Sequence, residues 1–207
     1  MLRILGKRQS INVRKVLWAC GELGVAYELE EWGTGTRPTS DTRFLALNPK
    51  ALVPVFIDGD AVLTESNTIV RYLAAKHGRS DLLPVEPLRR ARVEELMDWQ
   101  ATDFNSAWRV AFQAIVRKNP AAGSGEQVQR LLREWTSMLE LLEQRLAARR
   151  PFACGESFTV ADIVIGLSVN RWFQAPIERV PLPHVRAYLD LLMQRPASRP
   201  HLGAGTD

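Results

Sequence analysis

The sequence predicts an α/β N-terminal part that is followed by an all-helical C-terminal part. Strand-like and helix-like segments alternate over the first third of the chain, whereas only helical patterns occur from residue 88 onward. The composition fits a globular protein, because 46% of the 207 residues are hydrophobic and 24% are charged. These values exclude the disordered and fibrous classes.

The first segments follow the order strand, helix, strand. Leu2–Leu5 is a short strand candidate, and a helix from Asn12 to Gly24 fits apolar residues that recur at helical spacing. Asn12 is a good N-cap and Gly24 is a good stop signal. A second strand is expected at Ala26–Glu31, followed by a short helix at Asp41–Leu47.

The next segments add a hairpin and a third helix. Val55–Ile57 and Val62–Leu63 flank the turn Asp58-Gly59-Asp60, which is a strong hairpin signal. A helix then fits residues from about Glu65 to Lys76. The order β-α-β and then β-β-α matches a thioredoxin-like unit, with its parallel crossover first and its hairpin second.

The remainder of the chain predicts helices alone. Two prolines and no periodic pattern mark the segment 79–87 as a linker. Helical patterns cover 88–117, 126–148, 159–173 and 183–194. We therefore expect a thioredoxin-like domain over 1–78, a linker over 79–87 and an all-helical domain over 88–207.

Positive charge is concentrated at the start of the chain. The formal net charge is +4, yet the first twenty residues contain five basic residues and no acidic one: Arg3, Lys7, Arg8, Arg14 and Lys15. A nucleic-acid binder usually shows a wider basic face. A local excess favours a small anionic ligand, and no nucleic-acid partner is expected.

The cysteines and the apolar runs predict a cytoplasmic protein. Cys20 and Cys154 have neither metal-ligand spacing nor a disulfide pattern, which fits a reducing compartment and predicts no metal site. No apolar run is long enough to cross a bilayer, and the N-terminus has no signal-peptide pattern, so no membrane partner is expected.

The first candidate site is the loop that leads into the first helix. A helix N-terminus carries partial positive charge and unpaired N–H groups, and Arg14 and Lys15 in the first turn add charge that opposes the helix dipole. Ser10 and Asn12 bring polar side chains to the same place. The combination predicts an anion site. The alternative is that Ser10 and Asn12 only cap the helix while the basic side chains are solvated.

Two further candidate sites follow along the chain. Pro54 stands at the entry of a strand and can be cis, which leaves the Val53 backbone to pair with an extended peptide. At the start of the third helix, Ser66 and the backbone N–H groups can receive a carboxylate, and Glu65 can pair with an ammonium. The alternatives are an ordinary turn and a plain N-cap.

Taken together and in this order, Ser10 with Asn12, Val53-Pro54 and Glu65-Ser66 resemble the glutathione site of the cytosolic glutathione S-transferases. The stretch Gly155–Asp162 resembles the helix-start motif of that family, with a capping box and a hydrophobic staple. The first loop is similar to that of bacterial members with Ser-x-Asn in place of a catalytic Tyr or Cys. Ala51 stands where relatives often have glycine.

The resemblance implies a thioredoxin-like domain joined to an all-helical domain, and conjugation of glutathione to a small hydrophobic or anionic electrophile. It implies catalytic roles in stabilising the thiolate for Ser10, Asn12 and Arg14. It implies glutathione-binding roles for Lys50, Val53, Pro54, Glu65, Ser66 and Asp103. A homodimer is also implied, in which Asp103 reaches the glutathione ammonium of the partner subunit.

Alternative functions share the same scaffold. Peroxide reduction, dehalogenation or isomerisation with glutathione would use the same N-terminal site, and a non-catalytic binding module is a further alternative. The complete polar set at Ser10, Asn12, Glu65 and Ser66 favours an enzyme.

Four aromatic residues recur near one face of the longest predicted helix, at spacings of five, four and four: Trp99, Phe104, Trp108 and Phe112. Packing in the core is the expected role. The alternative is that some of them, with Trp32, line an apolar pocket beside the glutathione sulfur, where Arg109 can attract an anionic substrate. Cys20 falls on the buried stripe of the first helix and is expected in the core.

Overall fold

The computed structural model describes residues 1–35, 37–149 and 151–203; residues 36, 150 and 204–207, which the predicted domains include, lie outside the described residues. The N-terminal part consists of β1 (Leu2–Leu5), α1 (Ile11–Leu23), β2 (Tyr27–Glu30), α2 (Thr42–Leu45), β3 (Val55–Asp58), β4 (Ala61–Leu63) and α3 (Ser66–Lys76). The strands form one sheet in the order β2-β1-β3-β4. β1 runs parallel to β2 and antiparallel to β3, and β3 is antiparallel to β4. This topology confirms the predicted thioredoxin-like unit.

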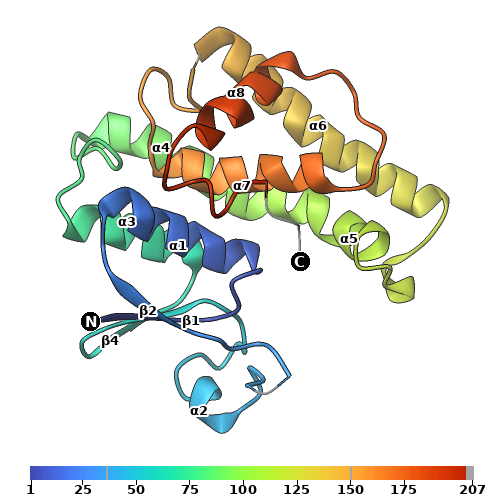
Figure 1. Cartoon of the computed structure of the whole chain (residues 1–207). Helices are drawn as coiled ribbons and strands as arrows, with labels where there is room; N and C mark the ends of the chain where they lie inside the picture. Colours follow the sequence, from blue (N-terminus) through green and yellow to red (C-terminus); the bar gives the residue numbers. More distant parts are fainter. Residues whose placement is uncertain (36, 150, 204–207) are drawn as a thin grey trace.

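The two faces of the sheet bury different side chains. Ile4 and Phe56 pack with α1 and α3, which cover one face of the sheet (Figure 1). Their chain neighbours Leu5 and Val55 point to the opposite face, where they form a smaller core with Phe44 of α2. The two-residue period of a strand explains this division.

The N-cap of α1 lies two residues earlier than predicted. Ser10 is the N-cap, because its carbonyl accepts the first helical hydrogen bond from the Arg14 N–H at 2.9 Å. The prediction that Asn12 caps the helix is therefore wrong, and Asn12 lies in the first turn. Gly24 is the C-cap with φ 64°, as expected for a glycine stop signal.

The C-terminal part contains only helices among the described residues. They are α4 (Pro87–Trp99), a π-helix (Gln100–Phe104), α5 (Asn105–Ile115), a 3₁₀ turn (Pro120–Ala122), α6 (Glu126–Arg149), α7 (Val160–Gln174) and α8 (Pro183–Met193). In the described ranges, no helix is both long and apolar enough to cross a membrane.

The helix predicted over 88–117 is interrupted by the π-helix. A π turn holds one more residue than an α turn. The five-residue step from Trp99 to Phe104 matches this geometry, and the two ring centroids lie 5.0 Å apart. Phe104, Trp108 and Phe112 are buried, which confirms the core-packing interpretation for these three residues.

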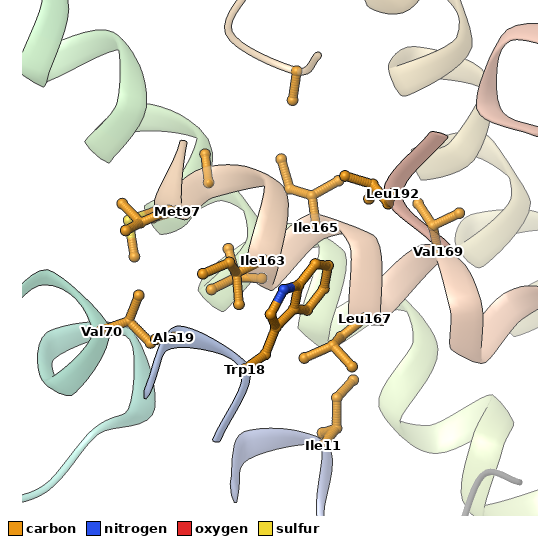
Figure 2. Close-up of a cluster of buried hydrophobic side chains, with 14 of the residues drawn as sticks. Ile11, Trp18, Ala19, Val70, Met97, Ile163, Ile165, Leu167, Val169 and Leu192 are labelled. Atoms are coloured by element: carbon orange, nitrogen blue, oxygen red, sulfur yellow. The ribbon is translucent and has the colours of Figure 1, made fainter. Parts of the chain in front are cut away.

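Helix α7 lies at the centre of the molecule and joins the two parts. Trp18 of α1 lies beside Ile163 and Leu167 of α7 (Figure 2), and all three are buried. Cys20 is also buried in this core, as predicted. The Thr159–Asp162 capping box that begins α7 is present, so the interpretation of that motif is confirmed.

Candidate functional site

The Ser10 side chain is available at the start of α1. Its backbone N–H donates to the Lys7 carbonyl at 3.0 Å, but its hydroxyl makes no capping bond to the helix. The side chain is half-buried. A hydroxyl that is not used as a cap, at the positive end of a helix dipole, can donate a hydrogen bond to a bound anion.

Asn12 connects the starts of α1 and α3. The Ser66 hydroxyl donates to Asn12 Oδ1 at 3.3 Å, although the two residues are 54 positions apart in the sequence. The positive ends of two helix dipoles therefore converge on one place. Asn12 thus faces the junction with α3, although it lies only two residues from Ser10 in the sequence.

Glu65 presents a carboxylate at the rim of the junction. Its backbone is in the left-handed region with φ 65°, and its carboxylate pairs with the Lys50 ammonium at 2.8 Å. Both side chains are more than half exposed, so a ligand can reach them. A non-glycine residue with positive φ costs energy and often marks a functional position.

The loop that contains Val53 and Pro54 lies before β3. The Val53–Pro54 peptide bond is cis, and Val53 lies two residues before Val55, the first residue of β3. Gly6 approaches this loop so closely that a Cβ there would lie 3.1 Å from Val53 Cβ. Glycine at position 6 thus lets the β1–α1 loop pack against the Val53 side chain.

A pocket of about 280 Å³ lies between α1, α3 and the α4–α5 region. Its lining is mostly polar and consists of Asn12, Lys15, Glu65, Ser66, Asn67, Thr68, Arg71, Asp98, Ala101 and Asn105. The structure therefore brings together three of the predicted residues, Asn12, Glu65 and Ser66. Ser10, Val53 and Pro54 are not part of this lining.

A buried polar network lies behind the pocket. The Lys15 ammonium donates to Asn67 Oδ1 at 3.0 Å and to Gln100 Oε1 at 2.8 Å. The Gln100 amide in turn donates to the Ser168 hydroxyl at 2.9 Å. The network therefore links α1, α3, the π-helix and α7. Sequence reasoning did not identify Gln100, and its only local signal is a polar residue beside an aromatic stripe.

Arg14 and Lys15, near the start of α1, are buried, which contradicts the alternative that they are solvated. Arg14 is 3% exposed, and its Nη1 donates to the His201 carbonyl at 3.2 Å, in the segment after α8. Burial, followed by the Arg14 and Arg8 charges, lowers the pKa of His201 to about 4. Arg14 therefore faces the C-terminal segment.

Other predicted residues lie outside the pocket. Asp103 and Arg109 are exposed, on the π-helix and on α5. Trp32 is buried against Phe44, with ring centroids 5.3 Å apart, in the smaller core of the N-terminal part. A role for Trp32 as a wall of an apolar substrate pocket is therefore not supported by its position.

A larger groove of about 810 Å³ lies elsewhere, between α6 and the segment 176–180. None of the predicted site residues lines it. Within the ranges that the structure describes, no group of three His, Cys, Asp or Glu side chains is arranged to hold a metal ion. The chemistry of the α1–α3 pocket is thus that of a polar site with helix N-termini, a carboxylate and hydroxyl groups.

Comparisons with known proteins identify the family of this chain. Residues 5–81 match the model of the glutathione S-transferase N-terminal domain, and residues 125–191 match that of the C-terminal domain. Glutathione S-transferase GstB of Escherichia coli strain K12 is 35% identical over 201 residues, which cover 96% of each chain. Glutathione S-transferase 3 of Zea mays is 31% identical over 95% of this chain and 90% of its own.

A solved structure extends the similarity to the fold. The theta class glutathione S-transferase of Xanthomonas axonopodis pv. citri, crystallised with glutathione bound, superposes with a TM-score of 0.92. The two sequences are 36% identical, and the alignment covers 100% of this chain and 99% of the other.

Proposed function

This chain belongs to the glutathione S-transferase family and is a glutathione transferase with glutathione as its co-substrate, and we propose that the pocket between α1 and α3 holds the γ-glutamyl end of glutathione. The observation that carries this proposal is the hydrogen bond between Asn12 and Ser66, which brings two helix N-termini to one pocket. A carboxylate fits there because both dipoles and the free N–H groups favour negative charge.

The remaining parts of glutathione follow from this placement. The α-ammonium pairs with the Glu65 carboxylate, next to Lys50. The extended peptide then runs along the Val53 backbone before the cis Pro54, as an added strand. This direction brings the cysteinyl thiol toward the start of α1, where the Ser10 hydroxyl has no capping partner.

Ser10 acts by stabilising the thiolate. A free thiol has a pKa of about 8.5 and is mostly protonated at neutral pH. A hydrogen bond from the Ser10 hydroxyl, with the α1 dipole, favours the thiolate, and a pKa lowered by about two units corresponds to about 2.7 kcal/mol. The thiol proton leaves to solvent, since a serine hydroxyl can donate a hydrogen bond to a thiolate but is not itself a base at neutral pH. The thiolate sulfur then forms a bond to the electrophilic carbon. In a substitution the leaving group departs with the electron pair of its bond, and in an addition the π electron pair of the double bond moves to the neighbouring atom, which is then protonated by solvent.

Ser10→Ala tests this role. We expect the variant to raise the apparent pKa of bound glutathione and lower turnover, with little loss of glutathione affinity. Ultraviolet titration of the thiolate in the complex measures the pKa, and Ser80→Ala, at an exposed position between the two parts, is the matched control. A Ser10→Ala curve that overlays the wild-type curve would show that Ser10 is only structural.

The finer assignments belong to the same proposal. In the Ser-x-Asn loop, Ser10 contacts the glutathione sulfur and Asn12 positions the Ser66 hydroxyl. Arg14 contributes positive charge from its buried position. The electrophile is small and hydrophobic or anionic, and the enzyme is cytoplasmic. The domain division at 1–78, 79–87 and 88–207 separates glutathione binding from electrophile binding.

A homodimer completes the proposed site. Asp103 is exposed on the π-helix and does not line the pocket of its own chain. We propose that it meets the glutathione ammonium of a partner subunit, a role that its exposure allows. Light scattering should give twice the chain mass of 23.3 kDa, and a monomer at micromolar concentration would contradict this arrangement.

A further inference from the structure

Lys15 is a buried cation whose bonding capacity is not filled. The residue is 3% exposed and still forms part of the pocket lining. An ammonium has three N–H donors. Two of them reach Asn67 and Gln100, and the third has no hydrogen-bond acceptor among the residues that the structure describes.

The two acceptors of Lys15 are fixed by their own bonds. Asn67 Nδ2 donates to the Met97 carbonyl at 2.8 Å, and Gln100 Nε2 donates to the Ser168 hydroxyl at 2.9 Å. Each amide oxygen is consequently turned toward Lys15. The network orients the ammonium but contains no carboxylate that neutralises it.

The charged groups around Lys15 do not replace the missing anion. Glu65 approaches from the start of α3, but it is exposed and already paired with Lys50. Asp98 of α4 pairs with Arg71 of α3. Arg171 of α7 adds repulsion, and burial together with this repulsion lowers the pKa of Lys15 to about 7, against a smaller opposing effect of Glu65.

We propose that Lys15 is the buried counter-ion of the γ-glutamyl carboxylate of glutathione, a binding and positioning role that rests on the proposed function of the pocket. The carboxylate arrives at Ser66, and Lys15 holds the next residue, Asn67, from behind. The same ammonium thus orients the first turn of α3 and supplies the charge that the ligand carboxylate meets.

This role predicts that ligand binding is coupled to proton uptake. Near pH 7 the empty site holds Lys15 partly as the neutral amine. An arriving carboxylate favours the ammonium and raises its pKa, so a proton is taken up. Affinity is therefore highest below pH 7 and falls as the pH rises through 7, by about tenfold between pH 6 and pH 8 if only the ammonium form binds.

Calorimetry with S-methylglutathione separates this proton from that of the thiol. The probe keeps both carboxylates and has no ionisable sulfur. At pH 7, titrations in buffers of different ionisation enthalpy should show uptake of about half a proton by the wild type. Lys15→Met should abolish the uptake and flatten the pH profile, whereas Lys76→Met, an exposed lysine at the far end of α3, should leave both unchanged.

Gln100→Glu is a second variant that preserves side-chain size. The new carboxylate lies next to the ammonium and keeps Lys15 charged, so the uptake at pH 7 should vanish while the probe still binds. Wild-type binding without proton uptake, or equal uptake by Lys15→Met, overturns the role of Lys15 and leaves the pocket assignment standing. Failure of the wild type to bind S-methylglutathione overturns the pocket assignment and, with it, this inference.

Discussion

Removal of the Asp162 carboxylate should cause a large loss of stability. The side chain is fully buried and accepts four hydrogen bonds. The Thr159 N–H and hydroxyl donate to Oδ2 at 2.8 and 3.1 Å, and the Ala153 N–H and Tyr188 hydroxyl donate to Oδ1 at 2.8 and 3.0 Å. One carboxylate therefore caps α7, anchors the preceding loop and ties α7 to α8.

The magnitude for Asp162→Ala follows from these bonds. Loss of a helix cap costs about 1 kcal/mol, and each buried donor left without a partner costs about 1–3 kcal/mol. Burial also raises the pKa of the Asp162 carboxyl, because desolvation disfavours its charged form. This desolvation cost offsets part of the stability that the four hydrogen bonds provide. We expect a net loss of about 3–5 kcal/mol in the free energy of unfolding.

Urea denaturation followed by circular dichroism measures this loss. Asp162→Asn should fall between the wild type and Asp162→Ala, because its amide oxygen can still accept from one pair of donors. Asp190→Ala, which removes an exposed partner of Arg186 on α8, is the surface control and should change stability by less than about 0.5 kcal/mol. A loss below about 1 kcal/mol for Asp162→Ala would refute the reasoning.

Two further changes test other parts of the fold. Burial lowers the pKa of His201 from its ordinary value of 6.5 to about 4, so stability should fall as the pH drops from 6.5 to 4, by up to about 1.4 kcal/mol per pH unit. His201→Gln should reduce that slope in urea denaturation at several pH values, and an unchanged slope would contradict the assignment. Ala51 has φ 55°, so Ala51→Gly should stabilise the protein by about 0.5–1 kcal/mol. A decrease in melting temperature for Ala51→Gly would show that this loop is not strained.

The sequence predicted the sheet and the helices well because their signals are local. The hairpin at Asp58–Asp60, the Gly24 stop and the capping box of α7 each depend on a few neighbouring residues. The start of α1 was misplaced because Ser10 and Asn12 are both suitable caps. Their roles are distinguished by the bond from the Arg14 N–H to the Ser10 carbonyl and by the bond that Asn12 Oδ1 accepts from the Ser66 hydroxyl.

The burial of Arg14 and Lys15 could not be predicted from local pattern. Their partners are far away in the sequence, at His201 for Arg14 and at Asn67 and Gln100 for Lys15. Lysine and arginine side chains are almost never fully buried unless they are paired, so the local pattern gave no sign of this burial. The cluster of charge led to the prediction of an anion site, and in the structure the lysine of that cluster, Lys15, is buried and lines the α1–α3 pocket.

The π-helix explains how the C-terminal helical part contributes a side chain, Gln100, to the polar network behind the α1–α3 pocket. If the α-helix continued past Trp99, Phe104 would lie on a different face of the helix from Trp99, since the step of five residues between them exceeds one turn. The π turn absorbs the extra residue, so Phe104 returns to the core while Gln100 points to Lys15 and Ser168. The step of five residues between Trp99 and Phe104 was thus a readable signal. It marks where the α-helix changes to a π-helix, and where the Gln100 side chain joins the buried network behind the pocket.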